Sequence, residues 1–530
     1  MSKSPRVYLI ILAVWAVLLT LLLPTSYHQA QRATEGGWPV VVLVVTSAVF
    51  IAYFWLNGTK DIVYTLYYHL VAARRHRPVP ARGTGGRPPR VVLVYCTCND
   101  FSADSLARSM RQRYDNYQTV ILDDSTKPEY LAQVDAFAAE HDVLVVRRGG
   151  RAGFKAGNLN NFLRTADFDY FVILDSDEII PPGYIERSLD YFAHHAEAGV
   201  VQANHIATRN RNAFMRMFSI GVDSHWVAYQ TVKDRFGFLS LLGHGAMVSR
   251  ACYDAADGFP HVVSEDLCFS IAARDAGYLT VFAPDIICEE EYPVDYLAFK
   301  KRHSKWTQGN MEFIKRYTGV IVRSRMTWFE KLDIFLFTYN LPLTAVFSLY
   351  VVIHVIALPL LGYQIAFPLW MLLPTAVFLA APMLNDLVFH WRSMPKRQLL
   401  WYTMHTVLLY GSMLFISIRA SLTSAFGRSV FLVTPKEDQR TSVRQALVAN
   451  RNEIIFGVSL LAVSLVLVGS VLPVLFIAMP ATLCAYLAVK HNRPAADVTL
   501  PEAETPNTPE PRWGADVETP NAPEREPVRA

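Results

Sequence analysis

Charged residues are scarce in this chain of 530 residues: Asp, Glu, Lys and Arg make up 18%, whereas apolar residues make up 52%. This balance excludes an ordinary soluble enzyme, yet it leaves too many charges for a bundle of membrane helices alone. The net charge is only +4, and there is no Lys/Arg block with interleaved aromatic residues, so we expect no nucleic-acid partner. Because the apolar residues are unevenly distributed, we expect membrane segments that flank a soluble body.

Cysteine is also rare, and the few cysteines form neither a CxxC pair nor a zinc-type spacing. The six residues are Cys96, Cys98, Cys252, Cys268, Cys288 and Cys484. Cys96 and Cys98 lie in a run that is typical of a buried strand. We therefore expect reduced, structural thiols, which is consistent with a body in the cytoplasm.

Long uncharged runs predict the membrane segments. They cover residues 7–23, 38–56, 335–361, 363–384, 399–418 and 454–489, and the last is long enough for two helices with a break near Gly469 to Pro473. Each segment is about long enough to cross a hydrocarbon core of about 30 Å. The first run has the position of a signal peptide, but Leu22-Leu23-Pro24-Thr25 lacks a small-x-small cleavage site, so we expect a retained helix.

Basic residues predict the orientation of these segments. Arginines follow the second run and place the next part of the chain inside the cell: Arg74, Arg75, Arg77, Arg82, Arg87 and Arg90. Basic residues also flank the run 399–418 on both sides, and one helix cannot cross with both ends inside. We therefore expect this run to lie along the cytoplasmic interface. Six spans remain, with both termini in the cytoplasm of a plasma (inner) membrane protein.

The chain then divides into four predicted parts. Residues 1–80 hold two transmembrane helices and a connector, and residues 90–325 form the soluble body with interfacial helices. Residues 326–490 form a membrane region that includes an interfacial helix over 399–426 and a loop over 428–445. Residues 491–530 form an acidic, proline-rich tail with almost no apolar pattern, which we expect to be disordered.

The body has the pattern of an α/β domain. Short β-branched runs at 91–95, 119–122, 143–146 and 170–174 alternate with helix-like segments such as 102–113 and 127–140. This alternation predicts a parallel sheet. Ligands of such sheets bind at the carboxyl ends of the strands.

Polar residues follow three of these strands. They are Thr97-Cys98-Asn99-Asp100, Asp123-Asp124-Ser125 and Asp175-Ser176-Asp177-Glu178. Carboxylates that converge at one sheet edge would repel one another, and a Mg²⁺ or Mn²⁺ ion that carries phosphate oxygens would relieve this. Each motif alone is also explained by helix caps or turns. The three together favour the metal and phosphate interpretation.

Three further motifs carry candidate chemistry. Lys155-Ala156-Gly157-Asn158 lies in a glycine-rich basic patch suited to phosphate, although alone it is a weak signal. Ser264-Glu265-Asp266 precedes a helix-like stretch. Its carboxylates could supply a general base, or the motif could simply cap the helix. Arg302, Lys305 and Trp306 would share one helix face, either to contact diphosphate and sugar or to meet lipid headgroups.

As a set, these motifs resemble the D, DxD, TED and (Q/R)xxRW series of inverting, membrane-embedded family 2 glycosyltransferases. The resemblance covers about residues 35–490 and implies a GT-A-like cytoplasmic domain inserted between transmembrane helices. The hexapeptide Phe431-Leu432-Val433-Thr434-Pro435-Lys436 is similar to the FxVTxK gating loop of cellulose synthases and related processive synthases. In that family, the loop follows an interfacial helix and enters the active site over the bound nucleotide sugar.

The resemblance also implies roles for individual residues. The donor-binding set would be Thr97, Asp123, Asp124, Lys155, Gly157, Asn158, Asp175, Arg302 and Lys305. Asp175 and Asp177 would hold Mg²⁺ or Mn²⁺, and Asp266 would be the catalytic base. Trp306 and Glu265 would bind the acceptor, and the gating residues would be Phe431, Val433, Thr434 and Lys436. Ser264 replaces the usual Thr, and Lys305 replaces the usual Arg, which leaves no planar two-point contact to diphosphate from that position.

The expected function is processive, inverting synthesis of a β-linked polysaccharide from a nucleotide sugar, with UDP-hexose as the expected donor. The expected partners are this donor, the growing glycan and membrane lipid. Whether a periplasmic or export partner also takes part is left open. One alternative is a non-processive transferase that glycosylates a lipid acceptor, and another is an inactive channel or scaffold.

Overall fold

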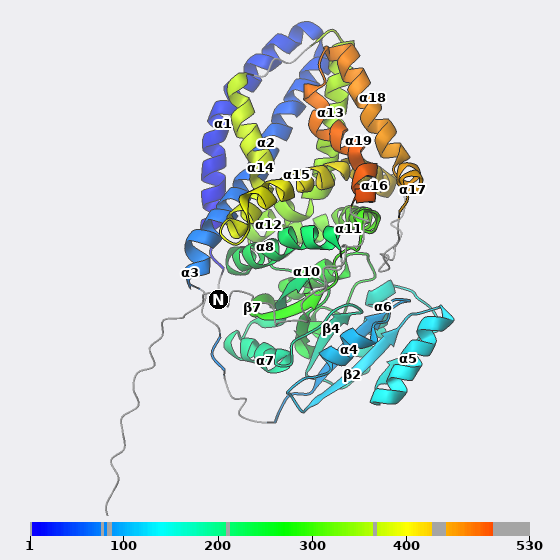
Figure 1. The fold of residues 1–530 in the computed structure, drawn as a ribbon. Helices are drawn as coiled ribbons and strands as arrows, with labels where there is room; N and C mark the ends of the chain where they lie inside the picture. Colours follow the sequence, from blue (N-terminus) through cyan, green and yellow to red (C-terminus); the bar gives the residue numbers. More distant parts are fainter. Residues whose placement is uncertain are drawn as a thin grey trace, which may run out of the picture.

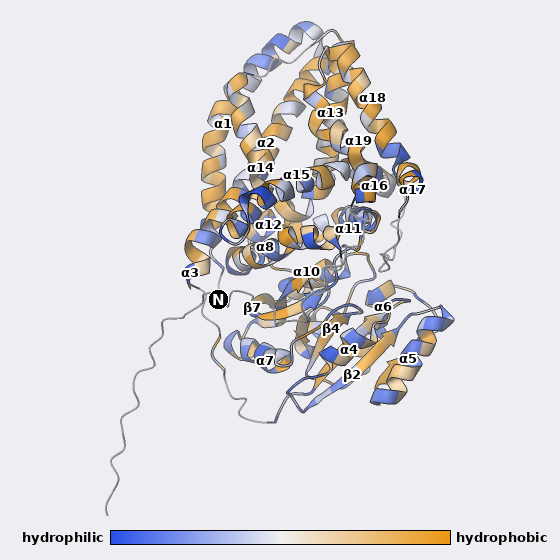
Figure 2. Ribbon diagram, viewed as in Figure 1, coloured by the Kyte–Doolittle hydropathy of each residue, from blue (hydrophilic) through white to orange (hydrophobic). Residues whose placement is uncertain are grey.

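The computed structural model describes residues 3–75, 79–81, 87–207, 212–363, 368–426 and 441–490. Two parts are visible in Figure 1: a bundle of long helices, and below it a domain built from a sheet and shorter helices. The hydropathy colouring of Figure 2 shows that the long helices are mostly hydrophobic along their length. The predicted disordered tail and the hexapeptide 431–436 lie outside the described residues.

The lower domain contains one seven-stranded sheet with strand order β3-β2-β1-β4-β6-β5-β7. Its strands are β1 (Val91–Thr97), β2 (Tyr117–Asp123), β3 (Leu144–Val146), β4 (Tyr170–Asp175), β5 (Ala198–Ala207), β6 (Ala246–Ser249) and β7 (Leu279–Glu290). The helices of this domain are α4 (Ala103–Ser109), α5 (Pro128–His141), α6 (Phe154–Leu163), α7 (Tyr184–His194), α9 (Arg250–Ala255) and α10 (Glu265–Asp275). The predicted α/β class is therefore confirmed.

The four predicted strands form the parallel part of the sheet. β1 pairs with β2 and β4 on its two sides, and β2 pairs with β3, in each case in parallel. The register Thr97↔Asp123 and Cys96↔Asp175 brings three strand ends to one edge, as the sequence predicted. The whole sheet is mixed, because the further strand β6 is antiparallel to both β4 and β5.

Two apolar layers cover the faces of this sheet. One includes Leu93, Val172 and Val201 with Ile185 of α7, and the other includes Val94 with Leu159 of α6. All six cysteines are free, as expected. The predicted helix 102–113 is shorter than expected, because the chain turns after Ser109 and Arg113 N–H donates to the carbonyl of Pro182 at 2.9 Å.

The long helices precede and follow the sheet domain along the chain. They are α1 (Arg6–Ala33), α2 (Trp38–Tyr67), α13 (Asn340–Leu360), α14 (Leu372–His390), α18 (Arg451–Val468) and α19 (Leu475–Lys490). Shorter helical turns connect some of them: η1 (Thr34–Gly36), η2 (Tyr68–Ala72), α3 (Ala73–Arg75), η3 (Leu369–Met371) and η4 (Leu472–Val474). The predicted break near Gly469 is confirmed, because Gly469 ends α18 with a φ of 73°. Gly58 of α2 packs against Phe378 of α14, where a β-carbon would lie 2.5 Å from the Phe378 side chain.

Between the bundle and the sheet lie α8 (Ala213–Phe236), α11 (Tyr296–Arg323) and α12 (Trp328–Thr338), as Figure 1 shows. α15 (Lys396–Ser412) crosses obliquely beneath the long helices, and α16 (Leu414–Phe426) follows after a break at Met413. Tyr402 of α15 donates to Asp386 of α14 at 2.6 Å. Ser224 of α8 donates to the same carboxylate, so one aspartate joins three helices.

Six helical segments of the described chain are long and apolar enough to cross a membrane: Arg6–Gly36, Trp38–Ala72, Leu369–His390, Lys396–Phe426, Arg451–Val468 and Leu472–Lys490. Six segments were also predicted from the sequence, but the two sets of six are not the same. The set found in the structure includes Lys396–Phe426, which we predicted to lie at the interface, and it omits α13. Length and composition alone do not decide between crossing and lying flat, so the interfacial position stays a prediction. The predicted loop 428–445 extends too far toward the C-terminus. Ser442 already caps a further helix, α17 (Val443–Ala449).

Candidate active site

A cavity of about 1710 Å³ extends from the strand ends of the sheet into the helical bundle. At the sheet it is lined by predicted site residues: Thr97, Asp124, Lys155, Asn158, Asp175, Asp177, Glu265, Asp266, Arg302, Lys305 and Trp306. These residues come from β1, β4, α6, α10 and α11 and from the segments that follow β2 and β4. The fold therefore brings most of the sequence motifs to one wall of one cavity.

Two predicted donor residues lie behind this wall rather than on it. Among the described residues, the cavity lining does not include Asp123 or Gly157. The Asp123 carboxylate is buried. It accepts hydrogen bonds from Arg147 Nε and from the backbone N–H of Ser125, each at 2.8 Å. It therefore holds the loop that follows β2 in place, and direct nucleotide contact by Asp123 stays a prediction.

Gly157 acts through close packing of α6. A β-carbon at this position would lie 2.0 Å from the carbonyl oxygen of Ala152 and 2.6 Å from Nη1 of Arg148. Arg148 in turn holds the carboxylate of Asp124. The neighbouring Asn158 is buried and lines the cavity, and its Oδ1 atom has no hydrogen-bond partner among the described residues.

Lys155 connects the end of β4 to the segment that precedes β6. Its ammonium forms an ion pair with the carboxylate of Asp175 and also donates to the carbonyl oxygen of Gly243 at 2.7 Å. Burial alone would lower the pKa of Lys155, but the adjacent Asp175 carboxylate raises it above its ordinary value. Lys155 therefore stays charged beside the position where the resemblance places the donor phosphates.

Glu265 and Asp266 form a close acidic pair at the N-terminus of α10. Burial raises the pKa of Glu265 to about 7, and the Asp266 charge adds to this shift. Burial also raises the pKa of Asp266, although the backbone N–H of Leu267 and the Lys155 charge oppose the shift. A carboxylate whose pKa is raised toward neutrality is a stronger proton acceptor, as a general base requires.

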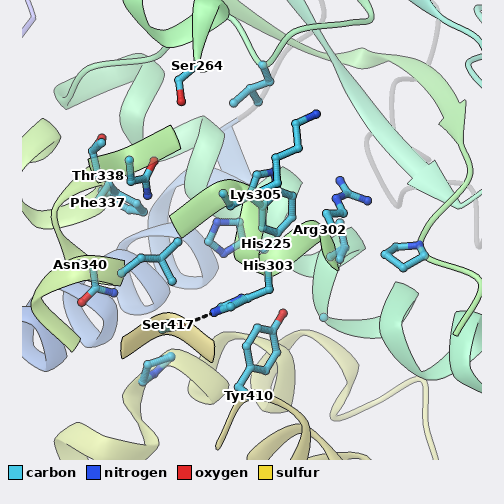
Figure 3. A pocket seen from close by; sticks show the side chains of 18 of the residues that line it. His225, Ser264, Arg302, His303, Lys305, Phe337, Thr338, Asn340, Tyr410 and Ser417 are labelled. Carbon is cyan, nitrogen blue, oxygen red and sulfur yellow. Dashed lines mark hydrogen bonds between the residues drawn. The ribbon is translucent and has the colours of Figure 1, made fainter. Parts of the chain in front are cut away.

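Arg302, Lys305 and Trp306, which were predicted to share one helix face, all lie on α11. The Arg302 guanidinium lies over the Trp306 ring, with its Cζ atom 4.5 Å from the ring centroid, and Trp306 remains 42% exposed. Figure 3 shows Arg302 and Lys305 on the same helix as His303, whose Nε2 lies 2.7 Å from the Ser417 hydroxyl of α16. Burial lowers the pKa of Lys305, and the Glu265 carboxylate opposes that shift.

Sequence reasoning missed a second polar group behind Asp177. It consists of Glu178, His205, His244 and Glu290. Burial alone would lower the pKa of His244, but the carboxylates of Glu178 and Glu290 raise it to about 10. The only sequence signal was the pair of glycines around His244, because β5 and β7 bring the other members together from distant positions.

The donor set of the sheet edge suits a divalent cation. Asp175 and Asp177 offer carboxylate oxygens at the carboxyl end of β4, and both line the cavity. Mg²⁺ and Mn²⁺ are hard cations that take such oxygens together with substrate phosphates. The residues present therefore fit the predicted ion.

The other end of the cavity lies among the long helices. Its lining there includes Asn57 and Asp61 of α2, Asp386 of α14 and Tyr410 of α15. Figure 3 shows Tyr410 and Ser417 facing the same space as Arg302. Polar side chains thus continue from the sheet edge into the apolar bundle.

Comparison with known proteins gives one family match and several relatives. Residues 170–418 match the model of the family described as Glycosyl transferase family group 2. Two curated relatives from Arabidopsis thaliana are named probable glucomannan 4-beta-mannosyltransferases 11 and 10. Each is 27% identical to this chain, over 224 and 226 residues. The matched part is 40% of this chain in both cases and spans only 51% and 41% of the relatives' lengths.

Solved structures are similar to the chain at lower identity. The mannosyltransferase PcManGT from Pyrobaculum calidifontis, in complex with GDP-Man and Mn²⁺, has a TM-score of 0.44 and 18% identity, and the match covers 71% of this chain and 99% of that one. S. aureus TarS 1-349 in complex with UDP-GlcNAc has a TM-score of 0.34 and 13% identity, and the match covers 63% and 90% of the two chains.

Proposed function

We propose that this multi-pass membrane protein, a glycosyltransferase whose residues 170–418 match the model of Glycosyl transferase family group 2, builds a β-linked polysaccharide from a nucleotide sugar. The observation that carries the proposal is the continuous cavity. It joins the carboxylates of the sheet edge to polar residues of the membrane helices. Such a cavity offers a growing glycan a route from the site of transfer into the bundle.

The donor occupies the sheet edge in this proposal. Asp124 and Asn158 line the part of the cavity nearest the β2 end and would contact the nucleoside, with Thr97 beside them. Asp175 and Asp177 would hold Mg²⁺ or Mn²⁺, which supplies charge neutralisation for the diphosphate. Lys155 adds a fixed positive charge at the same place.

The acceptor approaches from the α11 side. Trp306 is partly exposed and can stack on a sugar. The Arg302 guanidinium lies over the same ring. Asp266 would remove the proton from the acceptor hydroxyl, whose oxygen then bonds to the anomeric carbon as the bond to the nucleoside diphosphate breaks. Attack from the face opposite the leaving group inverts the anomeric centre. Lys305 stabilises the departing negative charge as a point charge rather than a fork.

The hexapeptide 431–436 supports repeated transfer by its sequence. Phe431, Val433, Thr434 and Lys436 occupy the conserved positions of the FxVTxK pattern, and we propose that the loop closes over the bound donor. The inner membrane and a cytoplasmic catalytic domain are part of the same proposal, because the arginines between Arg74 and Arg90 favour that side.

Donor screening tests this function. Purified full-length protein is incubated with radiolabelled UDP-glucose, UDP-N-acetylglucosamine and GDP-mannose, the last because the curated relatives are named as mannosyltransferases. We expect metal-dependent incorporation from one of these donors into a β-linked product, with Asp266→Asn as the matched blank. Wild-type protein that binds nucleotide but transfers no more label than this variant would contradict the proposal.

A further inference from the structure

Four side chains meet beside the turn that carries Asp177: Glu178, His205, His244 and Glu290. His244 Nε2 lies 3.2 Å from Glu290 Oε2, and His244 Nδ1 lies 3.3 Å from Glu178 Oε2. The His205 ring lies 4.6 Å from the His244 ring, at an angle of 77° between their planes. One donor atom each from His205, His244 and Glu290 lies within 4.8 Å of the others. None of these residues has a role in the transfer reaction described above.

The state of His205 is unusual for a buried imidazole. The side chain is fully buried, and neither ring nitrogen has a hydrogen-bond partner among the described residues, although Nε2 lies 3.7 Å from Glu178 Oε1. The ring is held by stacking on Trp226, with centroids 4.4 Å apart and planes 14° apart. Leaving a buried polar atom unpaired costs about 1–3 kcal/mol. A ligand that accepts a nitrogen lone pair would remove this cost.

The distances around His244 are compatible with a metal ligand and a supporting carboxylate. Two atoms bound to the same tetrahedral Zn²⁺ at about 2.0–2.1 Å lie roughly 3.4 Å apart, close to the separation of His244 Nε2 and Glu290 Oε2. A histidine that binds a metal through one nitrogen donates its other N–H to a carboxylate in most proteins. Glu178 Oε2 lies 3.3 Å from Nδ1 and could accept such a bond after a small turn of the ring, because Nδ1 has no hydrogen-bond partner among the described residues.

We propose that His205, His244 and Glu290 form a binding site for a transition-metal dication such as Zn²⁺, separate from the Mg²⁺ or Mn²⁺ at Asp175 and Asp177. Two imidazoles and one carboxylate suit Zn²⁺, whereas Mg²⁺ prefers oxygen ligands alone. His244 and Glu290 both line the cavity, so an ion held by them would be open to it. Three protein ligands with one open position is the arrangement of reactive rather than purely structural zinc sites.

Such an ion would also fix the segment that precedes His244. The Gly243 carbonyl accepts a hydrogen bond from Lys155, and a β-carbon on Gly243 would lie 3.2 Å from Asp266 Oδ2. Gly245 has no room for a side chain either, because a β-carbon would lie 2.3 Å from both Glu178 Oε1 and His205 Nε2. The metal would therefore hold the short glycine-flanked turn between the donor charge and the proposed base.

The test uses metal binding and needs no transferase activity. Full-length protein in detergent is stripped with a chelator and titrated with Co²⁺, whose visible absorption reports a four-coordinate site, and Zn²⁺ content is measured separately by mass spectrometry. We expect one Zn²⁺ per chain and a Co²⁺ spectrum that is lost in His205→Gln and in Glu290→Gln. Glu178→Leu keeps the ligands but removes the supporting carboxylate, so it lowers Co²⁺ affinity by about 10–100-fold.

Two control variants separate this site from its neighbours. Asp177→Asn removes a ligand of the other proposed ion and leaves the Co²⁺ spectrum unchanged. Cys288→Ser changes a fully buried thiol that lies near Glu178 and His205, and it also leaves the spectrum unchanged. A thiolate-to-cobalt absorption band that disappears in Cys288→Ser overturns the ligand set. Wild-type protein that binds no more Co²⁺ than Glu290→Gln overturns the site itself.

Discussion

Arg148 holds both carboxylate oxygens of Asp124 at the edge of the candidate donor site. Nε donates to Oδ1 at 2.9 Å and Nη2 donates to Oδ2 at 2.6 Å. The same guanidinium donates to the carbonyl oxygens of Ala152 and Phe154 at 2.6 and 2.7 Å. The position of a carboxylate that faces the cavity thus depends on the loop that leads into α6.

Gly157→Ala tests this dependence. The new methyl group would collide with the Ala152 carbonyl and with Arg148, and such overpacking typically costs about 1–3 kcal/mol. We expect weaker binding of the donor nucleotide in calorimetric titrations. Gly149→Ala is the matched control, because nothing lies within 4 Å of a β-carbon there. Equal nucleotide affinity in both variants would remove Gly157 from the donor site.

Asp266→Asn tests the proposed base. The substitution keeps the size of the side chain and removes the proton acceptor, so we expect transfer to fall by about 10²–10⁴-fold while nucleotide affinity changes little. The measurements are the initial rate of sugar transfer and the dissociation constant of the nucleotide. A variant that keeps its rate within about tenfold of wild type would exclude Asp266 as the base.

The pH dependence of transfer follows from the burial of the same pair. A general base acts only when deprotonated, and the pKa of Asp266 is raised above its ordinary value of 3.8. Activity should therefore be lost on the acid side at a higher pH than an exposed aspartate would give. Glu265, with a pKa of about 7, is neutral across most of that limb, so Glu265→Gln should leave the limb in place. The check is the pH profile of kcat for both proteins, and a limb that lies at the ordinary value of an exposed aspartate contradicts this assignment.

The sequence predicted the strand ends better than the sheet as a whole. β1 to β4 consist of β-branched runs, and their pattern identified both the strands and the polar residues that follow them. β5 escaped prediction because Gln202, Asn204 and His205 are buried within it and break the apolar pattern. β6 has only four residues, and its antiparallel pairing depends on distant partners that periodicity does not reveal.

The candidate site shows the same limit. Single motifs identified the residues that line the cavity, because each motif follows a strand or begins a helix. The pairing of Arg147 with Asp123 and of Arg148 with Asp124 was not predicted, since it depends on how one loop folds against another. The group around His244 was missed for the same reason, because its members come from β5, β7 and two turns.

Thiol labelling tests the position of α15 and α16. If these helices lie along the cytoplasmic interface, Ser393→Cys and Val443→Cys, on either side of them, should both resist a membrane-impermeant reagent added outside the cell. Glu35→Cys, in the turn η1 between α1 and α2, is the positive control and should react if both termini are inside. The background must lack the native reactive thiols. Labelling of Ser393→Cys or Val443→Cys from outside would instead make Lys396–Phe426 a crossing segment.

The central claim is that one chain extends the same glycan repeatedly at the mouth of the membrane cavity. The most direct measurement is the length distribution of the product while most of the donor is still unused, with enzyme far below donor and an excess of unlabelled acceptor added after the reaction begins. A processive synthase gives long β-linked polymers with few short oligomers, and the late acceptor captures little label. A product of one or a few sugars on a lipid that passes into organic solvent would contradict the account.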